Sequence, residues 1–170
     1  MTWVPRENEA GIQAIATTST TQQHKVGKVI RAADPTYGGG EFIYLLGVVG
    51  TVAGLAVVYD GTTGHTALTS TSGVVDGGSP LAVAMSANVA SQWGWYQIGG
   101  NSVVLKTATQ ITPATPKVYL SATAGRVMPT SVAGRQILGA RFSTVATVTT
   151  TTSTVVVTLN RPSQKTGTLV

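Results

Sequence analysis

The feature that most constrains the fold is a run of eighteen residues without a charge, residues 42–59. This length is the lower limit for a membrane-spanning helix, and Gly50 and Gly54 form a GxxxG pair within it. However, the run is rich in β-branched residues, and Asp60-Gly61 directly after it is a hairpin turn signal. The flanks also lack the Lys/Arg bias and the Trp residues that orient a helix in lipid. We therefore expect two buried β-strands joined by a Gly-rich turn, and no membrane partner.

The remainder of the chain has the pattern of short strands separated by Gly, Pro, Asn and Ser, and helical periodicity is not sustained anywhere. Strand-like segments occupy residues 66–70, 80–86, 93–99, 102–107, 117–121, 135–149 and 153–160. Only 10% of the residues are charged, so an open sheet would have poorly protected edges. We therefore predict an all-β fold, a compact antiparallel β-barrel or sandwich with an extended N-terminal arm.

A degenerate repeat supports the all-β prediction. The order "LAVVYD", a loop and "PLAVAMSANVASQWGWYQIGG" recurs about sixty residues later as "KVYLS", a loop and "RQILGARFSTVATVTTTTSTVVVTLNRP". In each half, a short strand is followed by a longer segment that bends at small polar residues and returns. The match is one of pattern more than of identity.

We expect three regions: an extended arm over residues 1–37, a β-barrel body over 38–162 and a tail over 163–170. The arm is polar and then basic, and it ends in Asp-Pro and three glycines, a composition that favours an extended segment. Its Trp3 is costly to leave in water, so we expect it either in a neighbouring subunit's pocket or against its own barrel. We expect the barrel to fold without residues 2–24. The candidate interface residues are Trp3, Pro5, Lys25, Lys28, Arg31 and Tyr37.

The net charge of +5 is unevenly distributed along the chain. Residues 1–76 contain all six acidic residues and four basic ones, whereas residues 77–170 contain seven basic residues and no acidic one. Diffuse charge of one sign favours a broad acidic protein surface as the partner. The basic residues are spread singly, without the aromatic interleaving of a nucleic-acid groove, so we expect no nucleic-acid partner.

No motif in the chain predicts catalysis. There is no cysteine, and His24 and His65 lack metal-ligand spacing. A triad of His65, Asp60 and a serine has no G-x-S-x-G turn to present the nucleophile, and the glycines at 38–40 are not followed by the Gly-Lys-Ser/Thr of a P-loop. We therefore expect no metal, no cofactor and no enzymatic activity.

The stretch "WGWYQIGG" brings three aromatic residues together, Trp93, Trp95 and Tyr96. On a strand, Trp93 and Trp95 share one face, and Tyr96 and Ile98 share the other. A strand that is apolar on both faces is typical of burial on both faces, so we expect a core or subunit-interface role. The alternative is a platform for a sugar, which needs polar groups that converge around exposed rings.

The segments "RAADPTYGGGEFIYLLGVVGTVAGLAVVYD", "AVAMSANVASQWGWYQI" and "RQILGARF" resemble the capsid decoration, or cement, proteins of tailed bacteriophages. The resemblance covers residues 28–162. It implies a β-rich protein on the capsid surface of a virion, commonly a homotrimer, with the major capsid protein as partner and the host cytoplasm as the place of assembly. The resemblance implies no catalytic residue.

Two other functions stay open from the sequence. One is a carbohydrate-binding β module on a virion or tail fibre. The other is a membrane-active protein that uses residues 42–59.

Overall fold

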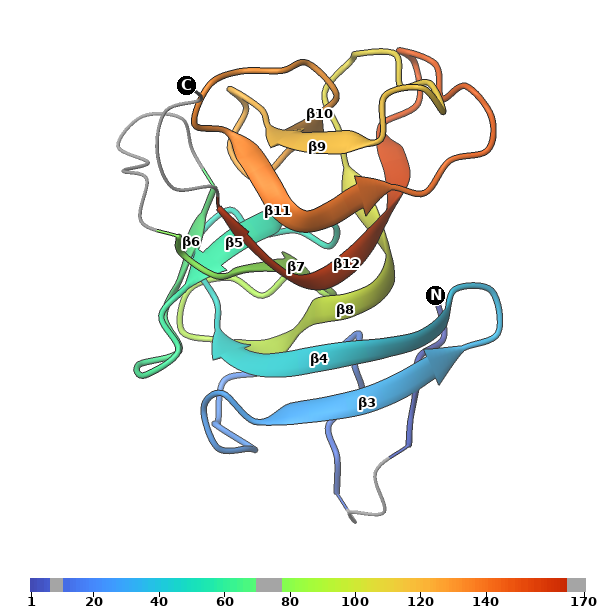
Figure 1. Cartoon of the computed structure of the whole chain (residues 1–170). Helices are drawn as coiled ribbons and strands as arrows, with labels where there is room; N and C mark the ends of the chain where they lie inside the picture. The colour runs from blue at the N-terminus through green and yellow to red at the C-terminus, as the bar shows by residue number, and fades with distance from the viewer. Residues whose placement is uncertain (7–10, 70–77, 165–170) are drawn as a thin grey trace.

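The computed structural model describes residues 1–6, 11–69 and 78–164, and this part of the chain is all-β, as predicted, with no helix (Figure 1). The strands within these ranges are β1 (Val4–Pro5), β2 (Thr18–Ser19), β3 (Val29–Asp34), β4 (Gly38–Leu46), β5 (Ala56–Tyr59), β6 (Thr66–Leu68), β7 (Leu81–Ala84), β8 (Trp93–Leu105), β9 (Lys117–Leu120), β10 (Val127–Met128), β11 (Gln136–Phe142) and β12 (Thr154–Gln164). All of their pairings are antiparallel. Nothing in the described ranges forms a helix long and apolar enough to cross a membrane.

The strands form one sheet that curls into a barrel. Its main path is β1-β3-β4-β8-β12-β11-β9-β10, and β7 branches from β8 toward β5 and β6. The β5–β6 branch closes against the β10 end of this path, where the Ala56 N–H donates to the carbonyl of Gly125 and the Gly125 N–H donates to the carbonyl of Thr69, both at 2.8 Å. Figure 1 shows β9, β10 and β11 at one end of the molecule, β12 and β8 across its middle and the β3–β4 hairpin toward the other end.

The repeat seen in the sequence is confirmed as a match of topology. The first half has the strand order β6-β5-β7-β8 and the second has β10-β9-β11-β12. The two halves meet where β8 pairs antiparallel with β12, with Thr154 opposite Leu105 and Asn160 opposite Gly99. The same four-strand pairing order therefore occurs twice, and the two units are joined by their last strands, β8 and β12.

The charge-free run forms β-strands, as predicted. Phe42, Tyr44 and Leu45 of β4 are fully buried, and β5 follows after a Gly-rich connection. Antiparallel pairing of β5 with β6 confirms the predicted hairpin, although its loop is longer than two residues. The Asp60 carboxylate shapes this loop by accepting the backbone N–H of Thr62 at 2.7 Å.

Two predicted strand boundaries were wrong. The segments 93–99 and 102–107 are one strand, β8, because Gly99 and Gly100 continue the pairing with β4 instead of ending it. The segment 135–149 stays a strand only to Phe142, the end of β11.

The extended N-terminal arm is not confirmed. Six residues of β3 pair with β4, so a boundary after residue 37 divides this hairpin. Trp3 is 8% exposed, and its ring lies 4.9 Å from that of Phe42 in an edge-to-face arrangement. At the other end, the predicted tail 163–170 begins inside β12, and its residues 165–170 lie outside the described ranges.

Candidate functional site

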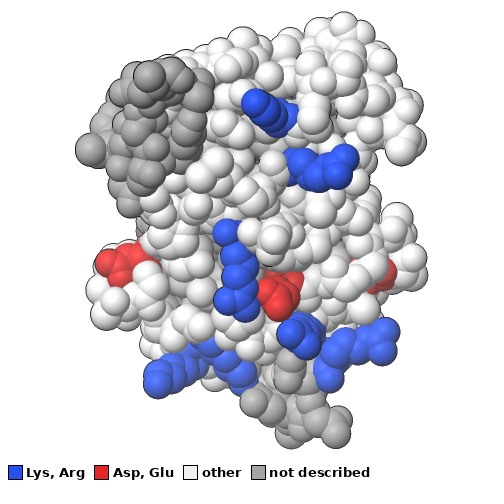
Figure 2. Space-filling model, viewed as in Figure 1, with Lys and Arg blue, Asp and Glu red and all other residues white. Residues whose placement is uncertain are grey.

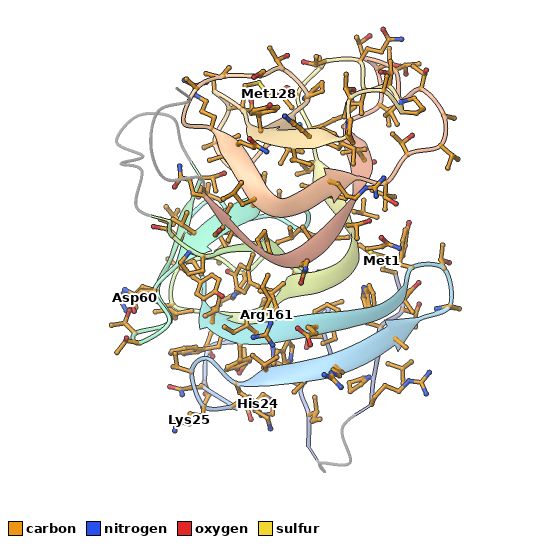
Figure 3. The ribbon with its side chains drawn as sticks, in the orientation of Figure 1. Met1, His24, Lys25, Asp60, Met128 and Arg161 are labelled. Carbon is orange, nitrogen blue, oxygen red and sulfur yellow. The ribbon has the colours of Figure 1, made fainter. Side chains whose placement is uncertain are left out.

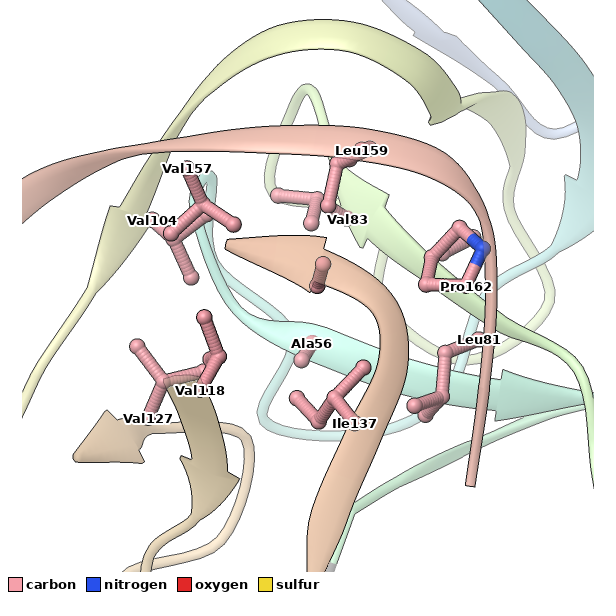
Figure 4. Close-up of a pocket in the computed structure, with 12 residues that line it drawn as sticks. Ala56, Leu81, Val83, Val104, Val118, Val127, Ile137, Val157, Leu159 and Pro162 are labelled. Atoms are coloured by element: carbon pink, nitrogen blue, oxygen red, sulfur yellow. The ribbon is translucent and has the colours of Figure 1, made fainter. Parts of the chain in front are cut away.

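The interior of the barrel is filled by its own side chains. Seven strands contribute apolar residues to it, and the remaining cavity has a volume of about 20 Å³ (Figure 4). The cavity is lined by Ala56, Leu81, Ala82, Val83, Val104, Val118, Val127, Ile137, Ala140, Val157, Leu159 and Pro162. Such a space is close to the size of one water molecule and has no polar side chain to hold it. In the described part of the chain, this cavity is therefore too small for a ligand larger than water.

An open groove of about 590 Å³ lies on the outer surface where β3, β4, β8 and β12 come together. Three arginines and one glutamate line it: Arg6, Arg31, Arg161 and Glu41. Figure 2 shows Lys and Arg side chains outnumbering acidic ones on this face, and Figure 3 labels Arg161 over β4 in the same orientation. We define these four side chains, with the glycines beneath them, as the arginine groove.

Glu41 lies between two of the guanidinium groups. The Nε atom of Arg161 donates to Glu41 Oε2 at 3.3 Å, and the Nε atom of Arg31 lies 3.6 Å from Oε1. The arginine side chains are 68% and 75% exposed, respectively, and that of Glu41 is 27% exposed. Burial raises the pKa of the Tyr59 hydroxyl, and the positive charge of Arg161 partly opposes this. Among the described residues that line it, the groove thus has more positive than negative side chains, and it is open to solvent.

Glycine forms the floor of the groove because the backbones of β4 and β8 approach closely there. Gly100 has a φ of +85°, and a Cβ atom on it would lie 2.2 Å from the carbonyl oxygen of Gly39. Only glycine fits such a position. The floor consists of Gly39, Gly40, Gly99 and Gly100.

A bulge in β12 carries Arg161 over this floor. The register with β11 shifts between Leu138 and Ala140, so Asn160, Arg161 and Pro162 lie opposite one residue, Gly139. Arg161 has a φ of +44°, one of two positive values among the described non-glycine residues. A bulge redirects a side chain away from its place in a regular ladder.

Three of the candidate interface residues lie against the chain's own sheet. Trp3 is buried in a cluster with Phe42, Pro5 pairs with Ala32 in β3, and Tyr37 packs on the Trp3 cluster. The sequence left two places for Trp3, a neighbouring subunit's pocket or the chain's own barrel. In the structure, Trp3 is buried against its own barrel.

The three basic candidates are not brought together. Arg31 lines the groove, whereas Lys25 and Lys28 precede β3 and are not part of the lining. Lys25 is exposed, and Lys28 is half-buried. Only Arg31 of the predicted basic stretch therefore belongs to the arginine groove.

No sequence pattern predicted that Arg6, Glu41 and Arg161 belong to one site. Glu41 and Arg161 are 120 residues apart in the chain, and no local pattern connects them. One usable signal was present: the glycine pairs at 39–40 and 99–100 both lie in strand-like surroundings, which is typical of a close approach between backbones.

The aromatic stretch is structural, as predicted. Trp95 and Tyr96 are both fully buried and belong to clusters on opposite faces of β8. Trp93 is half-buried, and its ring stacks on that of Tyr44 with a centroid distance of 6.0 Å. Trp95 and Tyr96 therefore present no ring face to a sugar.

The other candidate chemistry lies at Asp60 and His65. Hydrogen bonds from the N–H groups of Thr63 and Thr62 lower the pKa of the Asp60 carboxyl, so this group serves the turn. In the described ranges, no serine hydroxyl bonds to either residue, and no group of three His, Asp or Glu residues is placed to hold a metal ion.

Comparisons with protein-family models, with curated proteins and with solved structures found no match.

Proposed function

We propose that this protein is a virion structural protein that decorates and stabilises a phage capsid by binding the outer surface of its major capsid protein shell as a trimer. The observation that carries the proposal is the filled barrel, whose cavity of about 20 Å³ leaves recognition to the outer surface. The resemblance of residues 28–162 to capsid decoration proteins suggests the major capsid protein as the partner.

The sparse charge of the chain supports the same function. Only 10% of its residues are charged, so much of its surface is suited to coverage by neighbours in an assembly. A shell presents many equivalent sites. A trimer that binds several of them at once has a higher overall affinity than any one of its weak contacts gives, because binding is multivalent.

The proposal is tested by mixing the purified protein with undecorated heads of the phage that encodes it. We expect a species of three times the 17.4 kDa chain mass that sediments with the heads at a fixed saturating ratio and raises their disruption temperature. A protein that stays in the supernatant at physiological salt contradicts the proposal. Binding to glycans in the absence of heads would instead support the carbohydrate-binding alternative.

A further inference from the structure

The arginine groove combines a surplus of positive charge with an unusual backbone. Its described lining has three arginines against one glutamate, a net charge of +2. Arg161 adopts a left-handed backbone conformation although it precedes Pro162, which favours extended conformations in the residue before it. Unfavourable backbone conformations of this kind cluster at sites where the position of the side chain matters.

The internal ion pairs do not use the full binding capacity of Arg161. A guanidinium group can bind a carboxylate through two parallel hydrogen bonds of about 2.7 to 2.9 Å. Within the described part of the chain, the Arg161 guanidinium has one hydrogen bond, a contact of 3.3 Å from Nε to Glu41. The rest of this group faces solvent and is available to a second carboxylate.

The lining favours acidic protein over single-stranded nucleic acid as the ligand. Single-stranded nucleic acids bind basic grooves that also contain aromatic rings, on which the bases stack. Among the described residues that line the arginine groove, none is aromatic. The planar forks of arginine match carboxylates, and the low glycine floor leaves room for an extended chain to lie along it.

We propose that the arginine groove is the docking site for an acidic segment of a partner protein. Arg161 and Arg6 bind carboxylates of that segment, and Glu41 is the internal counter-ion of Arg161 that competes with them. This inference deepens the proposed function, since the acidic segment then belongs to the capsid shell.

The test measures binding of a capped hexaglutamate peptide to the full chain by calorimetry at low salt. We expect Arg161→Gln to weaken binding about fivefold, the effect of one exposed ion pair, and the double variant Arg6→Gln/Arg161→Gln to weaken it further. Glu41→Gln should strengthen binding about fivefold, because it removes the competing carboxylate. Arg141→Gln is the matched control: this exposed arginine of β11 is not part of the groove, and its loss should change the affinity by less than about twofold.

A purely structural ion pair gives a different result. In that case Glu41→Gln lowers the melting temperature and leaves peptide affinity unchanged, which overturns the inference. Equal loss of binding in Arg161→Gln and Arg141→Gln also overturns it, because it indicates diffuse charge attraction. Tighter binding of a six-nucleotide oligothymidine than of the peptide would assign the groove to nucleic acid.

The same variants separate this inference from the proposed function. If Arg161→Gln loses peptide binding but still sediments with heads as the unmodified protein does, decoration stands and the groove is not its docking site. If the groove binds the peptide and the unmodified protein does not sediment with heads, the acidic partner is another protein and decoration is excluded.

Discussion

At the scale of single residues, the burial of Trp95 shows why the aromatic stretch is part of the core. Its side chain is fully buried, its Nε1 donates to the carbonyl of Gln13 at 2.9 Å, and its ring lies 5.0 Å from that of Tyr44. Large apolar area and a satisfied polar atom make such a residue hard to replace.

We expect Trp95→Ala to lower the free energy of unfolding by about 3 to 5 kcal/mol, because it leaves a cavity among well-packed neighbours. Chemical denaturation followed by circular dichroism measures this. Trp93→Ala is the matched control and should cost less, since Trp93 is only half-buried. If Trp95→Ala keeps its stability and loses only ligand binding, the platform interpretation holds.

Asp34 gives the stability a dependence on pH. Burial raises the pKa of its carboxyl, but hydrogen bonds from the N–H groups of Thr36, Tyr37 and Thr2 outweigh this and hold the pKa below 3.8. A pKa that is lower in the folded state means that the unfolded state takes up the proton first. The stabilisation is therefore complete above pH 3.8 and is lost as the pH falls through the folded-state pKa.

We expect Asp34→Asn to be less stable than the unmodified protein at neutral pH and to match it progressively as the pH falls below 3.8. Denaturation midpoints measured across this range in both proteins provide the check. A difference that stays constant down to about pH 2 would show that the charge of Asp34 contributes nothing.

At the scale of elements, the N-terminal segment is part of the second core cluster. Trp3 and Ile15 are buried there with Phe42 and Trp95. Gln13 connects the segment to the sheet, because its side chain accepts the Tyr44 hydroxyl at 3.0 Å. These contacts argue against the sequence-based expectation that the barrel folds independently of residues 2–24.

We expect Trp3→Ala to lower the unfolding free energy by about 3 kcal/mol, equally at two protein concentrations about tenfold apart. Trp3→Phe is the matched control and should cost much less, because the Trp3 Nε1 has no hydrogen-bond partner among the described residues. A loss that grows on dilution would instead place Trp3 in a neighbouring subunit.

At the scale of the whole molecule, the cationic second half is less exposed than its residue count indicates. Lys106 is 1% exposed, and its ammonium group donates to the carbonyls of Thr107 and Thr109 at 3.1 and 2.9 Å. Arg126 is half-buried and donates to the carbonyl of Lys106. Neither residue is therefore well placed to contact a partner. The more exposed Arg161 is expected to contribute more than either of them to electrostatic attraction toward an acidic partner.

We expect attachment to heads to weaken as salt rises from low to about 1 M, where the screening length falls to about 3 Å. Sedimentation of the protein with heads at increasing salt measures the effect. The salt dependence should be shallower in Arg161→Gln and unchanged in Lys106→Met. Attachment that does not vary with salt would mean that apolar contacts dominate.

The sequence by itself determined the fold class, most of the strands and the burial of Trp95 and Tyr96. These features follow from local properties: alternation along a strand, β-branched composition and turn residues. The repeat could also be recognised, because the order of short and long strands survives when identity does not. Strand ends at glycine were the weak point, since Gly99-Gly100 can either stop a strand or let two strands approach closely.

Only the tertiary structure decided the place of the N-terminal segment and the composition of the arginine groove. A polar segment with one tryptophan has the same local pattern whether it lies on its own sheet or on a neighbour's. The groove depends on the bulge that carries Arg161 and on the register that puts Gly99 opposite Glu41. Strand register is set when whole strands pair, and it places residues that are far apart in the chain opposite each other. It therefore cannot be read from a local stretch of sequence.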